Sequence, residues 1–481
     1  MTRLTERVRV TAPWWVLLAT GLLGSLALVL SASSIGSVPR PYSYRWWWEG
    51  PLLSYGIAHV WFYVGLALLV ASWVLLGAHA RRGFLTRRTT SLFLAAWGGP
   101  LALGVPLFGR DVYSYAAQGT IAAQGLNPYH VAPLGTVHGV WADSLAEVWR
   151  NTTSPYGPLW VLCTKLVVNV AGPHLMSQIF GFRILTLASV AAVVLFIPMV
   201  ARRLGADPSV ALWIAVLSPL ALASGMSSAH NDLLMLAFVA GAGVLAVKGH
   251  TRWAIAVFSL AATVKLPALA GAVFVALAAG AGLPWRVRLR RHLIDLFIAV
   301  EPLVIVTWLA GNGWGWLSPT ALKIPTMLRI ITTPSVCLGT FIASVLHLVG
   351  VSASTHTIVG IVQPLVELAG TVVLVALLRG LTPDNQWRRL GFFLLITVLV
   401  SPTVWPWYYL WGIVVLAMTG AATTPLVLVL SAGIMLSVGP GGTPMLGGNG
   451  YLVVAPALVY GAWYAVRRGP VTRMLEGGDR A

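Results

Sequence analysis

Long apolar segments follow one another along almost the whole chain, and this repetition most constrains the fold. Each is roughly 20 residues long, enough for an α-helix to cross a hydrocarbon core of about 30 Å. Charged residues make up 9% of the chain and hydrophobic residues 58%, whereas ordinary soluble domains carry about 25% charged residues. The sequence therefore excludes a soluble globular protein and predicts an all-α, polytopic membrane protein.

The apolar segments predict about 12–14 transmembrane helices with the N-terminus in the cytoplasm. Two further apolar stretches, 157–171 and 336–349, are expected to be interfacial or re-entrant, because spanning would place the later arginine pairs outside. The expected spans are 14–36, 57–77, 91–107, 178–200, 209–226, 231–247, a Pro-interrupted pair at 252–264 and 267–281, then 293–310, 357–378, 390–404, 407–421, 424–439 and 451–466. They form one multispan unit, with an N-terminal segment (residues 1–90), a core (91–411) and C-terminal helices (412–481).

The net charge of +18 is concentrated in short arginine clusters between the apolar segments. These clusters are Arg81-Arg82, Arg87-Arg88, Arg202-Arg203, Arg286 to Arg291, Arg388-Arg389 and Arg467-Arg468. Such clusters orient a membrane protein and mark its cytoplasmic loops. The pattern therefore argues against nucleic-acid binding. The two cysteines, Cys163 and Cys337, give no metal-ligand spacing and no disulfide framework.

Carboxylates are scarce, so each one at the outer face can be considered individually. Asp and Glu total 13 residues, and the expected topology leaves Glu49, Asp111, Asp143, Glu147 and Asp232 outside. Of these, Asp111 and Asp232 lie closest to helix ends. A charged group at a membrane boundary is costly and needs a reason.

Asp111 lies in the segment Gly109-Arg110-Asp111-Val112-Tyr113-Ser114-Tyr115, directly after an apolar stretch. An Asp in the first turn of a helix is often only a cap. Its neighbours Arg110, Tyr113 and Tyr115 favour a site for sugar hydroxyls, from which a carboxylate can accept hydrogen bonds or remove a proton. Asp111 is therefore a candidate base.

Two other segments carry candidate substrate-binding residues. In His230-Asn231-Asp232, which precedes an apolar span, Asn231 and Asp232 are either helix caps or polar anchors for a substrate. His230 is the alternative base, or else a histidine with a structural hydrogen bond. In Ser154-Pro155-Tyr156-Gly157-Pro158-Leu159-Trp160 the prolines make a rigid start for a helix, while Tyr156 and Trp160 could stack on a sugar.

Three cations are candidates for binding a phosphate. Lys265, in Val264-Lys265-Leu266-Pro267, interrupts an apolar stretch that must enter and leave the membrane on the same side, and a cation at broken helix ends suits a phosphate. Arg183 lies near the outer end of its span, where snorkelling to the interface is an alternative explanation. Arg329 lies in the second large outer segment, 311–335. The aromatic segment 401–411, which includes Trp407, is either an interfacial belt or a wall facing the substrate.

Several catalytic motifs are missing from the sequence. It has no Walker-type phosphate loop, no GxGxxG after a strand, and no closely spaced His, Asp and Glu cluster for a metal, so a need for a divalent cation stays open. It also offers no soluble domain for a nucleotide sugar. If the chain transfers a sugar, a membrane lipid is the more plausible carrier of the donor.

Five segments together resemble the actinobacterial polyprenyl-phosphomannose-dependent α-1,6-mannosyltransferases (the MptA/MptB group) of the GT-C fold. In order they are Gly109 to Tyr115, Asn127-Pro128-Tyr129, Ser154 to Trp160, His230-Asn231-Asp232 and Lys265-Leu266-Pro267, and the resemblance covers roughly residues 90 to 411. It implies a polyprenyl-phosphate mannose donor, an α-1,6-mannan glycolipid acceptor, and products that are lipomannan and lipoarabinomannan precursors. It also implies inverting transfer at the outer face of the plasma membrane, with Asp111 or His230 as base.

Two other functions remain open from the sequence. A transporter or flippase of a lipid-linked glycan would place charged groups near the bilayer midplane, where Glu301, Glu367 and Lys265 are expected. A non-catalytic membrane scaffold is the third possibility, but it leaves the concentration of polar motifs on one face unexplained.

Overall fold

The computed structural model describes residues 12–39, 46, 48, 50–318, 333–437 and 439–442. Within these ranges the chain is helical throughout and contains no strand. Five of the described helices are long and apolar enough to cross a membrane: α1 (Trp14–Ile35), α2 (Tyr55–Ala80), α9 (Leu175–Arg203), α14 (Trp285–Ala310) and α17 (Thr355–Leu378). The polytopic, all-α architecture expected from the sequence is confirmed.

The first two spans form an antiparallel hairpin whose helices pack through glycine. A Cβ atom on Gly24 would lie 2.8 Å from the carbonyl oxygen of Gly65, and one on Gly65 would lie 2.7 Å from that of Gly24. Lipid supplies little hydrophobic drive for helix association, so close backbone approach through small residues holds such pairs together.

The next apolar segment is an irregular helix rather than a uniform span. It consists of α3 (Arg87–Phe93), a π-helical turn (Leu94–Gly98) and α4 (Gly99–Leu103). Pro100 has no N–H to donate to the preceding turn, and a π-turn accommodates such a gap in the ladder.

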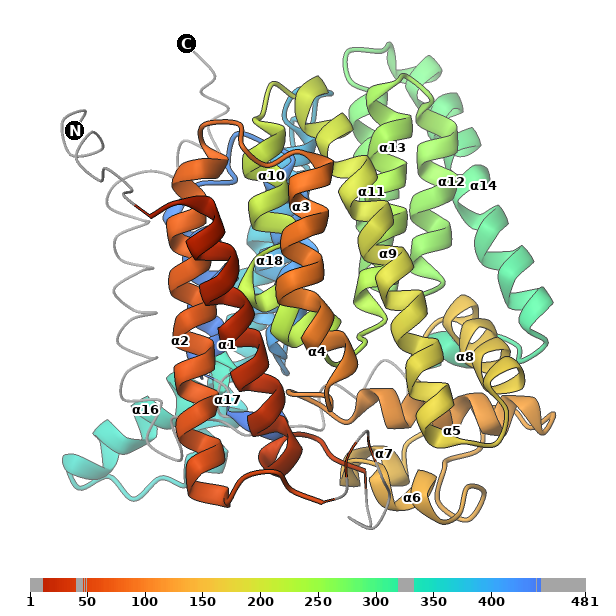
Figure 1. Cartoon of the computed structure of the whole chain (residues 1–481). Coiled ribbons are helices and arrows are strands. Elements are labelled where there is room, and N and C mark those ends of the chain that lie inside the picture. Colours follow the sequence, from red (N-terminus) through yellow and green to blue (C-terminus); the bar gives the residue numbers. More distant parts are fainter. Residues whose placement is uncertain are drawn as a thin grey trace.

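Helices at one end of the molecule lie across the long spans rather than along them (Figure 1). They are α5 (Asp111–Ala123), α6 (Val140–Ser144), α7 (Glu147–Arg150) and α8 (Pro158–Ala171). The stretch 157–171, which was expected to be interfacial, forms α8. This helix has 14 residues and is therefore shorter than the five long spans. The second such stretch is α16 (Pro334–Leu348), which packs against α17.

Arginine pairs gather at the opposite end. Arg81 and Arg82 follow α2, Arg87 begins α3, and Arg202 and Arg203 close α9. The Arg87 Nη2 atom donates a hydrogen bond of 2.9 Å to the carbonyl of Leu195 in α9, so these ends lie together. One face of the bundle is thus arginine-rich, and the transverse helices lie at the other (Figure 1).

The expected span 209–226 is wrong as a continuous helix. It is α10 (Pro208–Ala215) followed, after a break, by a π-helix (Leu220–Met226) bent by 44°. Pro219 cannot donate a backbone hydrogen bond, which explains the break. The expected span 407–421 is similarly interrupted, since a 3₁₀ turn (Pro406–Tyr409) precedes α19 (Leu410–Ala417).

The remaining helices follow the expected order. The Pro-interrupted pair is α12 (Thr251–Ala262) and α13 (Leu269–Ala279), joined by a tip that contains Lys265 and a 3₁₀ turn (Leu266–Ala268). The others are α11 (Asp232–Val247), α18 (Gln386–Val400) and α20 (Pro425–Ala432). Helix α20 is shorter than the expected span 424–439 and is followed by 3₁₀ turns at Gly433–Ser437 and Pro440–Gly442. Another 3₁₀ turn lies at Gly315–Leu317. The expected span 451–466 lies outside the described residues.

Candidate active site

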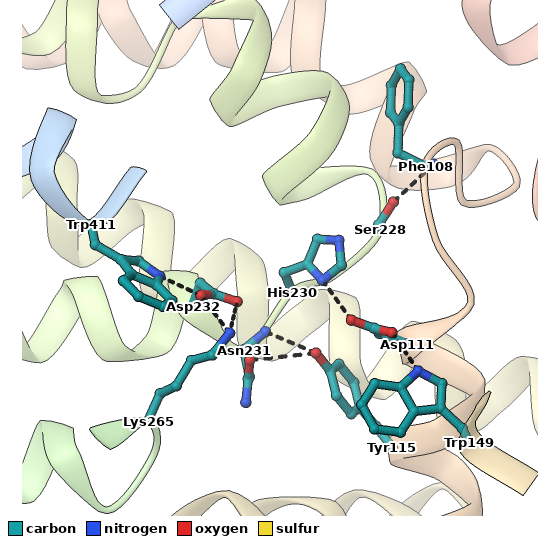
Figure 2. Close-up of polar contacts among 10 residues, drawn as sticks. All are labelled: Phe108, Asp111, Tyr115, Trp149, Ser228, His230, Asn231, Asp232, Lys265 and Trp411. Carbon is teal, nitrogen blue, oxygen red and sulfur yellow. Dashed lines mark hydrogen bonds and ion pairs between the residues drawn. The ribbon is translucent and has the colours of Figure 1, made fainter. Parts of the chain in front are cut away.

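Asp111 is held by two side chains from other regions of the chain (Figure 2). Its Oδ1 atom accepts a hydrogen bond of 2.9 Å from Trp149 Nε1, and its Oδ2 atom lies 3.5 Å from His230 Nδ1. Arg110 is the N-cap position of α5, and its side chain makes no capping hydrogen bond. Asp111 is therefore more than a helix cap, and its side chain keeps 14% exposure.

His230 follows a strained turn. The preceding residue, Ala229, has φ of 53°, a left-handed conformation that is unfavourable for a residue with a Cβ and that often marks a functional site. The imidazole is buried and stacks on Trp407, with ring centroids 3.7 Å apart. The turn is also tied to the segment before Asp111, because the backbone N–H of Phe108 donates to Ser228 Oγ at 3.3 Å.

The buried Asp232 and the partly exposed Lys265 form an ion pair beside the Asp111–His230 pair (Figure 2). Lys265 Nζ lies 2.8 Å and 3.0 Å from the two carboxylate oxygens of Asp232. Trp411 Nε1 donates to the same carboxylate at 2.5 Å, and the ammonium lies 4.2 Å from the ring centroid of Tyr408. The N-cap residue of α11 is Asn231, whose side chain makes no capping hydrogen bond, and the Asp232 carboxylate pairs with Lys265, which therefore already has an anionic partner.

Tyr115 contacts Asn231, which lies in sequence between His230 and Asp232. Its hydroxyl donates to Asn231 Oδ1 at 3.4 Å, and its ring packs edge-on against Tyr156 and Trp160, with centroids 5.3 and 4.8 Å away. Burial, followed by the charges of Asp111 and Asp232, raises the pKa of Tyr115 well above its usual value, and burial raises the pKa of Tyr156 in the same way. Both phenols are therefore neutral hydrogen-bonding groups at physiological pH.

Gly157 brings the α8 segment onto the tip that carries Lys265. A Cβ atom at position 157 would lie 2.1 Å from the carbonyl oxygen of Thr263. The backbone N–H groups of Gly157 and Leu159 donate to Val264 and Thr263 at 3.3 and 3.0 Å. The glycine in this motif thus permits a close backbone contact that positions the tip.

Arg183 is buried with some of its hydrogen-bonding capacity unused. Its side chain is 2% exposed, Nη2 donates to the carbonyl of Ser227 at 2.8 Å, and the guanidinium lies 5.3 Å from the ring of Trp46. Nε and Nη1 have no hydrogen-bond partner among the described residues. Snorkelling is thus the wrong explanation for Arg183, whose side chain is buried in the protein with no acidic partner among the described residues.

The other expected site residues take different positions. Arg110 Nη1 donates to the carbonyl of Ser144 at 2.9 Å, and Tyr113 is fully buried with its hydroxyl donating to the carbonyl of Ser37 at 2.6 Å. Both brace the loop around Asp111. Arg329 lies outside the described residues.

Three residues of the site were missed as individual contributors. Trp149 orients Asp111, while Trp411 and Tyr408 surround the Asp232–Lys265 pair. The signal for the last two was present, because segment 401–411 is dense in aromatic residues. Trp149 had only its position in the same outer segment as Asp111 to indicate it.

The described residues contain no group of three His, Cys, Asp or Glu side chains that could hold a metal ion. The site consists instead of two acid–base pairs, Asp111–His230 and Asp232–Lys265, walled by indole and phenol rings (Figure 2). Such an arrangement can remove a proton from a hydroxyl group.

Comparison with known families gives two adjacent matches. Residues 18–281 match the model of the alpha-(1->6)-mannopyranosyltransferase N-terminal domain, and residues 335–468 match that of the MptB C-terminal domain. Asp111, His230 and Lys265 fall in the first matched segment, and Trp407 falls in the second. The site therefore assembles from both.

Relatives of known name are similar over most of the chain. An alpha-(1->6)-mannopyranosyltransferase A of Mycobacterium tuberculosis is 30% identical to this chain over 433 residues. The match covers 86% of this chain and 82% of the length of the relative. Alpha-(1->6)-mannopyranosyltransferases A and B of Corynebacterium glutamicum are each 28% identical, covering 74% of this chain and 77% and 64% of their own. No solved structure matches the chain.

Proposed function

The chain belongs to the α-(1→6)-mannopyranosyltransferase family and is a membrane-bound glycosyltransferase, and from that premise we propose that Asp111 is its catalytic base. The donor is a polyprenyl-phosphate mannose, and the acceptor is the 6-hydroxyl of an α-1,6-mannan glycolipid. The observation that carries this proposal is the carboxylate of Asp111, which accepts a hydrogen bond from Trp149, keeps 14% exposure and lies 3.5 Å from the buried imidazole of His230.

The transfer is a single displacement. The Asp111 carboxylate takes the proton of the acceptor 6-hydroxyl, and the oxygen attacks C1 of mannose. The bond between C1 and the phosphate oxygen breaks, and polyprenyl phosphate leaves with the electron pair. A β-linked donor gives an α-linked product in this step, so the reaction inverts the anomeric centre.

Exposure favours Asp111 over His230 as the base. The Asp111 side chain is 14% exposed, whereas that of His230 is 0% exposed and packed on Trp407. Since a base must come within hydrogen-bond reach of the proton it removes, Asp111 is the group that meets the acceptor. His230 then orients the carboxylate, as Trp149 does on the other oxygen.

Arg183 and Lys265 are the two described candidates for the departing phosphate: Lys265 is the more exposed, and Arg183 is the one without an acidic partner among the described residues. Lys265 is already neutralised by Asp232 at 2.8 Å. Arg183 is buried and has two guanidinium nitrogens without partners among the described residues. A buried cation without an anion is unfavourable, so an anionic ligand is the natural partner, and an arginine fork suits phosphate oxygens.

The arginine clusters support an extracytoplasmic position of the site. Positive residues accumulate in cytoplasmic loops, and the arginine-rich end lies opposite the transverse helices α5 to α8 (Figure 1). Asp111 begins α5. We therefore place the reaction at the extracytoplasmic face of the plasma membrane, where lipomannan and lipoarabinomannan precursors would be extended.

A membrane assay tests this function. The full chain in liposomes is supplied with synthetic polyprenyl-phosphate mannose and a short α-1,6-mannoside, and the product linkage is determined by NMR. The proposal predicts a new α-1,6-mannosyl bond and release of polyprenyl phosphate. Movement of the lipid-linked sugar across the bilayer without a new glycosidic bond would instead establish a transporter.

A further inference from the structure

A basic pocket lies on the arginine-rich face, at the opposite end of the bundle from Asp111. Its volume is about 540 Å³, and Arg87, Arg88 and Arg202 line it. One carboxylate, that of Asp207, also lines it, but its Oδ1 atom accepts a hydrogen bond of 2.8 Å from the backbone N–H of Ser209 as the cap of α10. The pocket therefore offers net positive charge.

An apolar groove of about 570 Å³ continues from this pocket toward the membrane interior. It lies between the α3–α4 segment and α9, and Arg87 lines both the pocket and the groove. Leu103 and Leu187 mark its far end, and Ala95 and Ala191 line its walls. Arg87 and Leu103 are 16 residues apart, and at the α-helical rise per residue this corresponds to a groove about 24 Å long, directed along the helix axis.

Arg87 is fixed at the junction. Its Nη2 atom donates to the carbonyl of Leu195 at 2.9 Å, so the guanidinium stays beside α9, where pocket and groove meet. A cationic pocket joined end to end with an apolar groove of this length matches an amphiphile with an anionic head and a hydrocarbon chain. Basic pockets between transmembrane helices commonly bind anionic lipid head groups.

We propose that the pocket and the groove together bind one anionic phospholipid of the leaflet at the arginine-rich face. Its phosphate meets Arg87, Arg88 and Arg202, and one acyl chain lies between α4 and α9. The mannosyl donor is not the occupant, because a phosphate in this pocket lies at the far end of the bundle from Asp111 (Figure 1).

A lipid bound in the groove would also stabilise the segment that precedes His230. Met226, at the end of the π-helix, lines the groove. Its Cε atom packs onto Gly98, where a Cβ atom would lie only 2.2 Å away. The acyl chain therefore contacts a residue whose helix leads directly into the strained turn before His230. Since a ligand that binds the folded state stabilises it, the lipid should raise the thermal stability of the chain.

The test uses native mass spectrometry of the full chain in detergent with added phosphatidylglycerol. The Arg88→Gln/Arg202→Gln variant removes two pocket cations. The Arg82→Gln/Arg203→Gln control removes two arginines at the same end of the bundle that do not line the pocket. We expect bound phosphatidylglycerol to fall about tenfold or more in the first variant and to stay near wild type in the control. Equal binding by both variants would overturn the proposal.

A second pair of variants tests the groove. Ala191→Trp fills it, whereas Leu92→Trp adds the same bulk at an exposed position of α3 that does not line it. We expect phosphatidylglycerol to stabilise the wild type and Leu92→Trp against heating, but not Ala191→Trp. Equal stabilisation by inorganic phosphate would overturn the lipid assignment, since it would mean that only the basic pocket is occupied. Preferential retention of phosphatidylcholine would also overturn it.

Discussion

The Oδ2 atom of Asp111 lies 3.5 Å from Nδ1 of His230, although one residue begins α5 and the other precedes α11. Trp149 donates to the other carboxylate oxygen at 2.9 Å, and Trp407 covers the imidazole. A carboxylate held at one oxygen by Trp149 and placed beside His230 at the other has a restricted orientation, which favours proton transfer in a defined geometry.

Replacing Arg183 with methionine should separate stability from activity. The guanidinium is buried with two nitrogens lacking partners among the described residues, so its removal relieves an unfavourable charge. We expect Arg183→Met to be at least as thermally stable as the wild type, while kcat/KM falls by about 10²–10³ because the leaving phosphate loses its cation. Arg203 is an exposed arginine on the same helix, and Arg203→Met should change neither the thermal stability nor kcat/KM. A stable Arg183→Met enzyme with full turnover would exclude the phosphate role.

Breaking the Asp232–Lys265 pair should destabilise the fold. Lys265→Met leaves the buried carboxylate of Asp232 without its cation, a change that costs about 3–5 kcal/mol. The double variant Lys265→Met/Asp232→Leu should recover some of that loss, because no buried charge remains uncompensated. Denaturant unfolding in micelles measures both, with Lys165→Met, an exposed lysine of α8, as the control. If the loss of unfolding free energy in the double variant equalled the sum of the losses in the two single variants, Asp232 and Lys265 would not be coupled.

Gly157→Ala should displace the tip that carries Lys265. The added Cβ would lie 2.1 Å from the Thr263 carbonyl oxygen, and neither backbone can yield without moving the tip. We expect a loss of about 1–3 kcal/mol in stability and a strong loss of mannosyl transfer. Gly56→Ala on α2, where a Cβ meets no atom within 4 Å, serves as the control. Unchanged activity in Gly157→Ala would mean that the tip position does not matter for transfer.

Tyr115 should make the chain sensitive to alkali. Burial raises its pKa in the folded state above the usual value of about 10. The unfolded chain therefore loses this proton first as the pH rises, and folding stability falls above pH ~10, by up to about 1.4 kcal/mol per pH unit. Below pH ~10 both the folded and the unfolded chain keep the Tyr115 proton, so none of this stability is lost. Thermal unfolding from pH 8 to 11 should show a smaller alkaline loss in Tyr115→Phe, and an identical loss would contradict the burial effect.

The sequence predicted the membrane architecture because bilayer thickness sets a length for each apolar segment. It also separated the arginine pairs from the polar motifs, and the structure has α3 and α5, which begin at Arg87 and Asp111, at opposite ends of the bundle (Figure 1). It failed where proline interrupts an apolar run: 209–226 reads as one span, but Pro219 breaks it into α10 and a π-helix. Hydropathy cannot detect such a break, because proline changes hydrogen bonding more than polarity.

The candidate site was predictable as a set of residues but not as an arrangement. Asp111 and His230 were alternatives in sequence, and the structure brings them together. Asp232 and Lys265 were assigned to different roles, a substrate anchor and a phosphate ligand, yet they pair with each other. Pairings between distant segments depend on how the helices pack, for which one sequence carries no local signal. Trp149 was missed for the same reason.

Asp111→Asn tests the central claim most directly, because it keeps the shape of the side chain and the acceptor for Trp149 but removes the basic carboxylate. The measurement is mannosyl transfer from polyprenyl-phosphate mannose to a short α-1,6-mannoside, with Asp143→Asn, an exposed acid of the same outer segment, as the matched control. We predict that Asp111→Asn folds normally in membranes and loses transfer by about 10²-fold or more, while Asp143→Asn remains active. Transfer by Asp111→Asn at the rate of the control would contradict the assignment of Asp111 as the base.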